Sequence, residues 1–282
     1  MDLNTMIHFA QVVGKAYEIP PEQLNNSAGR VLTVTFGGTA TSYGVITTVY
    51  ANDLATDINR QRADKRVSIG LVLQNGATYD AVIAIRGTEG ILEWVQDARF
   101  LPVPCPFLTG AGQTEDGFTS MYSSFAVNST PGSASLTKSL KGLPWAQPPR
   151  SLTICGHSLG GALATLLALD VAANTAFSDP AVYTYASPRT GDTSFVSTYG
   201  HVVQRTSRIA NRLDLVPQLP PTPLYDHVAS LFELNPVVWS VPPKVLVKPD
   251  IACEHHLSTY LFLLTQLAGG TVLPLEQQCV PV

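Results

Sequence analysis

The segment that most constrains this chain is Gly156-His157-Ser158-Leu159-Gly160, which stands between two apolar runs of different character. The letters before it, SLTIC, are typical of a buried strand, and the letters after it, ALATLLALDVAA, contain neither Gly nor Pro and favour a helix. A bare G-x-S-x-G arises by chance about 0.1 times in a chain of this length. A strand, a tight turn and a helix around it are the context of a nucleophile elbow.

The glycines of this segment have a steric purpose. An elbow strains the serine backbone and leaves no room for neighbouring side chains, which explains Gly156 and Gly160. Ser158 would project above the N-terminus of the helix, where the helix dipole favours developing negative charge. The alternative, a strand–helix turn that merely needs glycines, is the weaker interpretation because the flanking elements match so well.

The remaining pattern predicts an α/β protein with one domain over residues 1–282. Residues 5–17 indicate an amphipathic helix, and residues 30–36, 43–51 and 66–73 are β-rich. Asn75-Gly76 signals a hairpin whose returning strand precedes Gly87. Short strands then alternate with helices, which is typical of crossover units. We therefore expect a mostly parallel central sheet flanked by helices.

The composition excludes several classes of protein. Of 282 residues, 45% are apolar and 13% are charged, so the chain is not intrinsically disordered. A net charge of -4 gives no general attraction to nucleic acid. No run reaches the roughly 18 apolar residues of a membrane-spanning helix. Four cysteines without a C-x-x-C pair argue against a zinc or redox motif, so we expect neither a metal nor a cofactor.

A serine nucleophile needs a base, and six histidines are available. His8 precedes the elbow, and His157 lies inside it and cannot easily reach back to Ser158. His201 and His227 fall in or near strand-like runs, where a polar side chain is more often structural. The adjacent pair His255-His256 opens the terminal helix, and only one member of the pair can face the serine. Helix capping is the alternative role for this pair.

The acid of a triad orients the base and stabilises its cation. Asp214 follows an apolar strand and precedes a loop, the edge where sites gather in parallel sheets. Asp192 and Asp226 are the next candidates, although each suits a turn. For the oxyanion, Leu159 supplies the N–H after the nucleophile, and Thr88, at the end of an earlier strand, is the second candidate donor. Alone, Thr88 reads more naturally as a turn residue.

These segments together resemble the class 3 lipase family, the fungal-type, Rhizomucor-like branch of the α/β-hydrolases. The resemblance rests on segments in family order across nearly the whole chain: residues 85–88, Trp94, Asp97, residues 116–118, GHSLGGALA, TYASPRTGD, RIANRLDLVPQLPP, Tyr225-x-His227 and His256-Leu257-Ser258. It implies Ser158, Asp214 and His256 as the triad, Thr88 and Leu159 as the oxyanion hole, and His227 on a structural strand. Ile85 and the Glu115-Asp116 pair depart from the common pattern and leave substrate preference open.

The resemblance also implies a lid over about residues 89–97. Ile91, Trp94 and Val95 share one helical face, and with Leu92 they are the predicted lid and substrate-binding residues. On the pattern alone, an ordinary surface helix is at least as good an interpretation. Phe100, Leu101, Val103, Pro104 and Phe107 follow and are candidates for an acyl groove.

The expected function is hydrolysis of acylglycerol esters through an acyl-enzyme at a lipid–water interface, without a cofactor. A feruloyl-type or short-chain esterase is the alternative, and a peptidase or a non-catalytic binding module is weaker. The first residues, MDLNTMIHFAQ, lack the regions of a signal peptide, so the chain is cytosolic or the mature form of an exported protein. The resemblance and the low charge favour secretion. Cys155 should be a free buried thiol, and Cys253–Cys279 is the expected disulfide.

Overall fold

A computed structural model of the chain describes residues 2–19, 27–52, 66–87, 100–130, 132–228, 230–235, 247 and 250–280. The strands of the main sheet are β1 (Val31–Phe36), β2 (Thr39–Asn52), β3 (Arg66–Asn75), β4 (Ala81–Ile85), β7 (Leu152–His157), β8 (Ala181–Tyr185), β9 (Arg205–Asn211) and β10 (Leu231–Leu234). A small second sheet pairs β5 (Pro102–Pro104) with β6 (Gln113–Glu115). The helices are α1 (Leu3–Glu18), α4 (Asp116–Ser123), α5 (Leu136–Ser139), α6 (Leu159–Asn174), α7 (Thr193–Val202), α8 (Ile251–His255) and α9 (Leu257–Leu267), with 3-10 turns at Leu140–Gly142, Val216–Gln218 and Gln277–Cys279.

The eight strands of the main sheet lie in the order β1-β2-β3-β4-β7-β8-β9-β10. Pairing is antiparallel from β1 to β4 and parallel from β4 to β10. The predicted hairpin joins β3 and β4 through a loop over residues 76–80. The Asn75 side chain stabilises this loop by accepting the N–H groups of Ala77 and Thr78. β4 pairs antiparallel with β3 and parallel with β7, and it is buried along its whole length, which suits an apolar run in a sheet covered on both faces.

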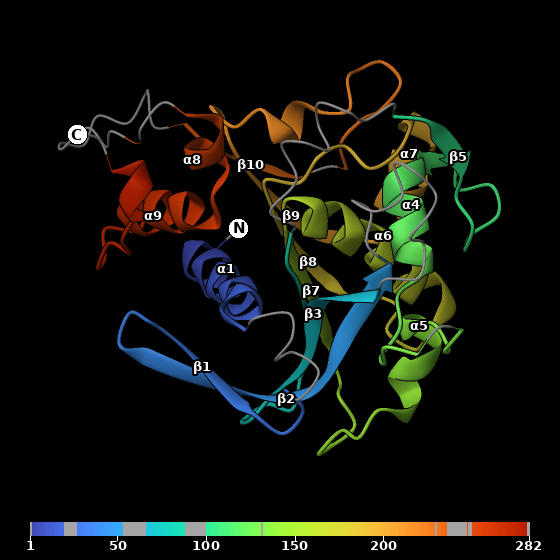
Figure 1. The fold of residues 1–282 in the computed structure, drawn as a ribbon, viewed down its shortest axis with the longest axis horizontal. Helices are drawn as coiled ribbons and strands as arrows, with labels where there is room; N and C mark the ends of the chain where they lie inside the picture. The colour runs from blue at the N-terminus through green and yellow to red at the C-terminus, as the bar shows by residue number, and fades with distance from the viewer. Residues whose placement is uncertain are drawn as a thin grey trace.

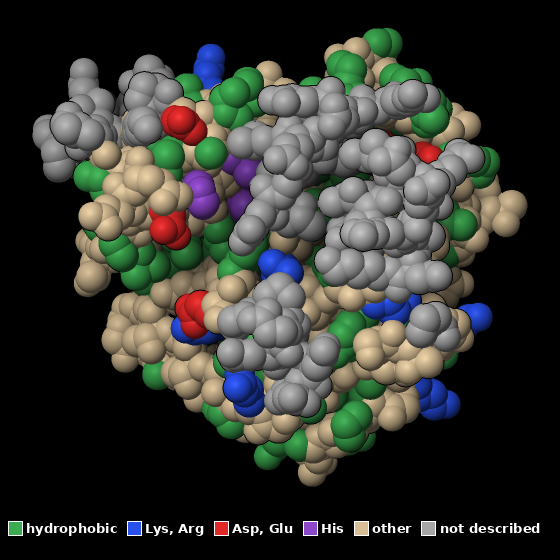
Figure 2. Space-filling view, viewed as in Figure 1, with side chains coloured by type: hydrophobic (Ala, Val, Ile, Leu, Met, Phe, Trp, Pro, Cys, Tyr) green, Lys and Arg blue, Asp and Glu red, His purple; other side chains and the backbone are tan. Residues whose placement is uncertain are grey.

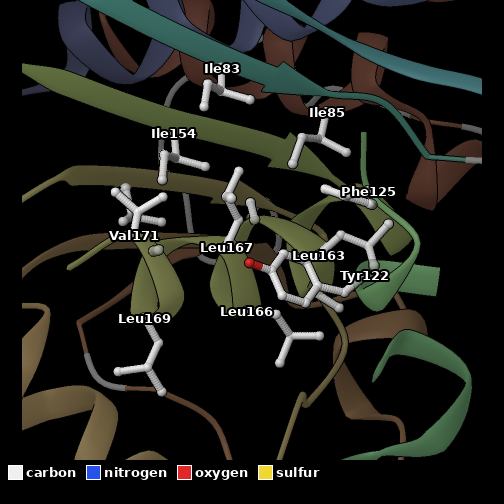
Figure 3. Packing of buried hydrophobic residues seen from close by; sticks show 14 of the residues in the cluster. Ile83, Ile85, Tyr122, Phe125, Ile154, Leu163, Leu166, Leu167, Leu169 and Val171 are labelled. Atoms are coloured by element: carbon white, nitrogen blue, oxygen red, sulfur yellow. The ribbon is translucent and has the colours of Figure 1, made fainter. Parts of the chain in front are cut away.

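Helices cover both faces of the sheet, as Figure 1 shows. One face carries α1 and α9, and its core includes Met6, Tyr185 and Leu263, all with 0% exposure. The other face carries α4 and α6, and Figure 3 shows Leu163 and Leu167 of α6 among side chains such as Ile154 of β7. Asp2 caps the N-terminus of α1, and its carboxylate accepts the N–H groups of Asn4 and Thr5 in the first turn.

The topology brings several loops to one edge of the sheet. Parallel strands end on the same side, so the residues after β4, β7 and β9 gather there. These positions belong to Gly87, Ser158 and Asp214. α8 reaches the same edge from the end of the chain, because its last residue, His255, bonds with both Ser158 and Asp214.

Candidate active site

Ser158 lies in the turn between β7 and α6, as the sequence predicts. Its backbone has φ 60° and ψ -131°, outside the regions that L-residues favour. The turn is held by two main-chain hydrogen bonds: the Ser158 N–H donates to the Tyr185 carbonyl at 2.8 Å, and the Ser158 carbonyl accepts the Gly161 N–H at 2.8 Å. The hydroxyl therefore sits at a strained position that the surrounding structure maintains.

The glycines beside Ser158 are required by close packing. A Cβ on Gly156 would lie 2.1 Å from the Gly160 carbonyl oxygen, and a Cβ on Gly160 would lie 2.4 Å from the Ile85 carbonyl oxygen. These contacts are with backbone atoms that cannot rotate away. The elbow therefore needs both glycines for the reason that the sequence suggests.

A histidine and an aspartate complete a line of hydrogen bonds that starts at Ser158. The His255 Nε2 atom lies 2.8 Å from the Ser158 Oγ, and the His255 Nδ1 lies 2.8 Å from the Asp214 Oδ2. The side chains of His255 and Asp214 are 7% and 0% exposed. On the face shown in Figure 2, histidine side chains gather in one place near acidic ones. The contacts of His255 with Ser158 and with Asp214 have the geometry of a Ser-His-Asp triad.

The choice of His256 over His255 from the sequence is wrong for this geometry. His255 is the last residue of α8, whereas His256 caps α9 with φ -57° and ψ 138°. The His256 carbonyl accepts the N–H groups of Thr259 and Tyr260, so this residue starts the terminal helix. The side chains of His255 and His256 point in different directions at this junction of α8 and α9. The position of each residue relative to the start of α9 does not reveal which side chain turns towards Ser158.

Asp214 is held by contacts that the sequence did not reveal. Its Oδ1 accepts the Val216 N–H at 2.9 Å, and its Oδ2 also accepts the Tyr260 hydroxyl at 2.8 Å. Burial and the neighbouring Asp214 raise the pKa of Tyr260 well above its usual value, so the phenol remains a donor. Tyr260 in turn accepts the Asn211 N–H at 3.0 Å. An apolar helix pattern alone gives no signal for this hydroxyl.

The other candidate residues have structural roles. Asp192 caps α7 by accepting the Phe195 N–H, and Asp226 accepts the His227 N–H. His201 lies in the last turn of α7, shortly before β9. His227 lies in a loop and not on the strand that the resemblance implies. Of the proposed groove residues, Phe107 packs edge-on against Tyr122 with ring centroids 5.2 Å apart and joins the core.

The predicted oxyanion hole and lid are only partly within the described residues. Leu159 is the first residue of α6, where a backbone N–H has no partner within the helix. Thr88 and residues 89–97, with Ile91, Leu92, Trp94 and Val95, lie outside the described residues. Among the residues that are described, no group of three or more His, Cys, Asp and Glu side chains is arranged to hold a metal ion.

Comparison with known proteins identifies the family. The model of the family described as Lipase (class 3) matches residues 82–224, slightly more than half of the chain. The chain belongs to the class 3 lipase family. The matched region contains Ser158 and Asp214 and ends before His255.

Several known proteins are similar in sequence to this class 3 lipase family member. Phospholipase A1-II 7 of Oryza sativa subsp. indica is 32% identical over 208 residues, which cover 64% of this chain and 50% of that protein. Secreted mono- and diacylglycerol lipase A of Penicillium cyclopium is 28% identical over 200 residues, covering 70% and 62%. The chain spans half the length of the first of these relatives.

The fold of this class 3 lipase family member is similar to that of a solved structure. A mutant form of MDLA from Penicillium cyclopium superposes with a TM-score of 0.61 at 23% identity, over 83% of this chain and 82% of that one. The α/β-hydrolase fold is thus confirmed. Within the described residues, no helix has the length and apolar character needed to span a membrane.

The class 3 lipase chain contains the disulfide expected from its sequence. Cys253 and Cys279 are bonded, and Cys105 and Cys155 are buried free thiols. Burial raises the pKa of the Cys155 thiol, which keeps it protonated. Because Cys253 lies two residues before His255, the bridge ties α8 to the C-terminal segment.

Removing this disulfide should destabilise the protein. Replacing both Cys253 and Cys279 with alanine opens a link across 26 residues and should lower the free energy of unfolding by about 3 kcal/mol through a less restricted unfolded chain. Urea unfolding measures the change. Reductant should lower the midpoint of the parent protein and leave the variant unaffected; a reductant effect on both proteins would contradict this assignment.

His227 should make the protein less stable in acid. Burial, and then the nearby Arg208, lower the pKa of His227 to about 3. An unfolded histidine has a pKa of about 6.5, so in the interval between these values only the unfolded state binds the proton, and stability decreases as the pH falls. The free energy of unfolding should drop by on the order of 1 kcal/mol between about pH 6.5 and 4.5, less than full linkage allows because part of the His227 side chain still faces solvent.

Replacement with glutamine provides the control for this pH effect. The His227 Nε2 lies 2.6 Å from the Pro217 carbonyl oxygen. The amide nitrogen in His227→Gln can donate the same hydrogen bond, but it does not titrate. Unfolding curves at the two pH values should show a smaller loss in the variant. Equal losses would assign the acid sensitivity to other groups.

Proposed function

We propose that this chain is a serine hydrolase that cleaves acylglycerol esters. The main support for this proposal is the pair of hydrogen bonds that His255 makes with Ser158 Oγ and with Asp214 Oδ2, each with a distance of 2.8 Å. Ser158 Oγ attacks the ester carbonyl carbon while His255 Nε2 takes the hydroxyl proton. The buried Asp214 carboxylate stabilises the imidazolium that forms. His255 then passes the proton to the departing alcohol, and an acyl-enzyme remains.

Water completes the reaction in the reverse order of proton transfers. His255 takes a proton from water, the hydroxide attacks the acyl carbon, and the proton returns to Ser158 Oγ as the acid leaves. The Leu159 N–H, supported by the dipole of α6, would stabilise the negative oxygen in both steps. Thr88 as the second donor is proposed from the sequence motif after β4.

The substrate proposal rests on the family and on the names of relatives. One relative is called a phospholipase A1 and another a secreted mono- and diacylglycerol lipase. We propose acylglycerols presented at a lipid–water interface as the substrates and secretion as the destination. The lid over residues 89–97 belongs to the same proposal, since an apolar-faced helix would be stabilised by opening at an oil surface. A single domain over residues 1–282 is proposed because one sheet takes its strands from residue 31 to residue 234.

A substrate series tests this function, with the Ser158→Ala variant as the blank. Activity should be higher on emulsions of long-chain triacylglycerol or on diacylglycerol than on soluble p-nitrophenyl esters of short acids. A preference for methyl ferulate or for short soluble esters would favour the esterase alternative, and a preference for phosphatidylcholine vesicles would place the chain with its phospholipase relatives. Failure of a fluorophosphonate to label Ser158 would contradict serine catalysis.

The lid requires its own variant. Replacing Ile91 and Trp94 together with serine removes two apolar side chains from one predicted helical face. Activity on emulsions should fall while activity on a soluble ester persists. Unchanged emulsion activity would remove the lid from the proposal.

A further inference from the structure

A second line of hydrogen bonds runs behind the proposed triad. The Gly87 N–H donates to the Tyr17 hydroxyl at 2.7 Å, and this hydroxyl lies 2.8 Å from the His157 Nδ1. The His157 Nε2 lies 2.8 Å from the carbonyl oxygen of His255. The reaction proposed above uses neither Tyr17 nor His157.

The chemistry of the partners determines where each proton lies. A carbonyl oxygen only accepts hydrogen bonds, so His157 must carry a proton on Nε2. Burial lowers the pKa of His157 well below its usual value, which leaves Nδ1 unprotonated and able to accept. Burial raises the pKa of Tyr17, so its hydroxyl keeps its proton and donates to that nitrogen while accepting from Gly87. The line is therefore fully paired in one neutral state.

This line joins segments that the reaction requires but the chain keeps apart. Gly87 packs so close to the elbow that a Cβ on it would lie 2.9 Å from the Ser158 Cβ. His157 directly precedes the nucleophile, and His255 carries the proposed base. The three contacts span 70, 140 and 98 residues of sequence, and all pass through Tyr17 in the last turn of α1 or through His157.

We propose that Tyr17 and His157 are positioning residues that hold the main chains of Gly87 and His255 around Ser158. We call the line of hydrogen bonds from Gly87 through Tyr17 and His157 to His255 the bridge. The inference rests on the proposed function, because the bridge would support the proton transfer between Ser158 and His255. Tyr17 is 36% exposed although its hydroxyl end is enclosed, so removal of the hydroxyl alone leaves the exposed ring in place. Because the bridge positions the reacting groups and the proposed reaction uses neither Tyr17 nor His157, loss of the bridge should lower kcat and leave KM unchanged.

Two replacements of His157 separate the halves of the bridge. The amide nitrogen in His157→Gln can take the place of Nε2 and donate to the His255 carbonyl, but it offers Tyr17 no acceptor at the Nδ1 position. The amide oxygen in His157→Asn can take the place of Nδ1 and accept from Tyr17, but the shorter side chain does not reach His255. If positioning of His255 matters more, kcat should fall further in the asparagine variant.

Steady-state kinetics on a soluble p-nitrophenyl ester test the bridge. Tyr17→Phe removes two hydrogen bonds and should lower kcat by about tenfold. Because His157→Gln already removes the partner of Tyr17, the Tyr17→Phe/His157→Gln double variant should lose far less than the product of the two single losses. Tyr199→Phe is the matched control: it removes a buried hydroxyl that contacts Thr206 at 2.8 Å, remote from the triad, and should leave kcat within about twofold.

A crystal structure of the Tyr17→Phe variant provides a readout independent of activity. The distance between Ser158 Oγ and His255 Nε2 should lengthen from 2.8 Å to beyond about 3.2 Å. An unchanged distance, an unchanged kcat with a lower Tm, or strictly multiplicative losses would each overturn the bridge. If the parent protein neither hydrolyses esters nor reacts with a fluorophosphonate, the proposed function fails instead, and the measured distance still decides the bridge.

Discussion

Replacing His255 with alanine should lower kcat by about a million-fold, the size of effect measured when the base of a serine triad is removed. The His255 imidazole is the group within 2.8 Å of both the Ser158 hydroxyl and the Asp214 carboxylate. Without it the hydroxyl keeps its proton and the carboxylate has no cation to stabilise. Hydrolysis of a p-nitrophenyl ester, measured with active-site titration, gives the effect.

The adjacent histidine provides the matched control. His256→Ala alters the residue that caps α9 and should leave kcat within about threefold, with a stability change of about 1 kcal/mol or less. Both variants change one imidazole in the same segment, so differences in folding alone do not account for opposite outcomes. Inactivity of His256→Ala beside an active His255→Ala would restore the assignment based on family resemblance.

Replacing Ser158 with glycine should abolish hydrolysis and at the same time stabilise the fold relative to Ser158→Ala. With φ 60° and ψ -131°, the backbone of residue 158 occupies the mirror image of the extended region, which glycine visits readily and alanine does not. Such strain costs on the order of 1–3 kcal/mol. After allowance for the greater flexibility of unfolded glycine, we expect a gain of about 1 kcal/mol for Ser158→Gly over Ser158→Ala.

Chemical unfolding of the two inactive variants measures this gain. Both lack the hydroxyl that contacts His255, so the lost hydrogen bond cancels in the comparison. The glycine variant should unfold at higher urea concentration with the same dependence on denaturant. An alanine variant as stable as the glycine variant would show that the elbow carries no strain.

The elements with strong local signals were predictable from the sequence. The elbow between β7 and α6, the hairpin of β3 and β4 and the position of Asp214 each follow from patterns that neighbouring residues enforce. The choice between His255 and His256 did not follow, because it depends on the direction of one side chain at the junction of two helices. Family resemblance reaches the segment but does not resolve this one-residue difference.

The supporting contacts were hidden for a different reason. Tyr17 and Tyr260 each occupy an ordinary position in an amphipathic or apolar helix, and their hydroxyl partners lie far away in the sequence. Periodicity predicts the face on which a ring lies but not the atom that its hydroxyl meets. His157 was correctly predicted not to pair with Ser158, yet its bond to the His255 main chain required the folded arrangement.

The position of α1 also affects how the chain can mature during synthesis. This helix is synthesised well before α9, yet it packs with Leu257, Tyr260 and Leu263 of α9. Its apolar residues Met6, Ile7 and Val13, fully buried in the folded protein, therefore lack part of their cover until α9 has been synthesised. We therefore expect α1 to stay partly exposed in the nascent chain, and a holdase that shields this helix should raise the yield of folded protein.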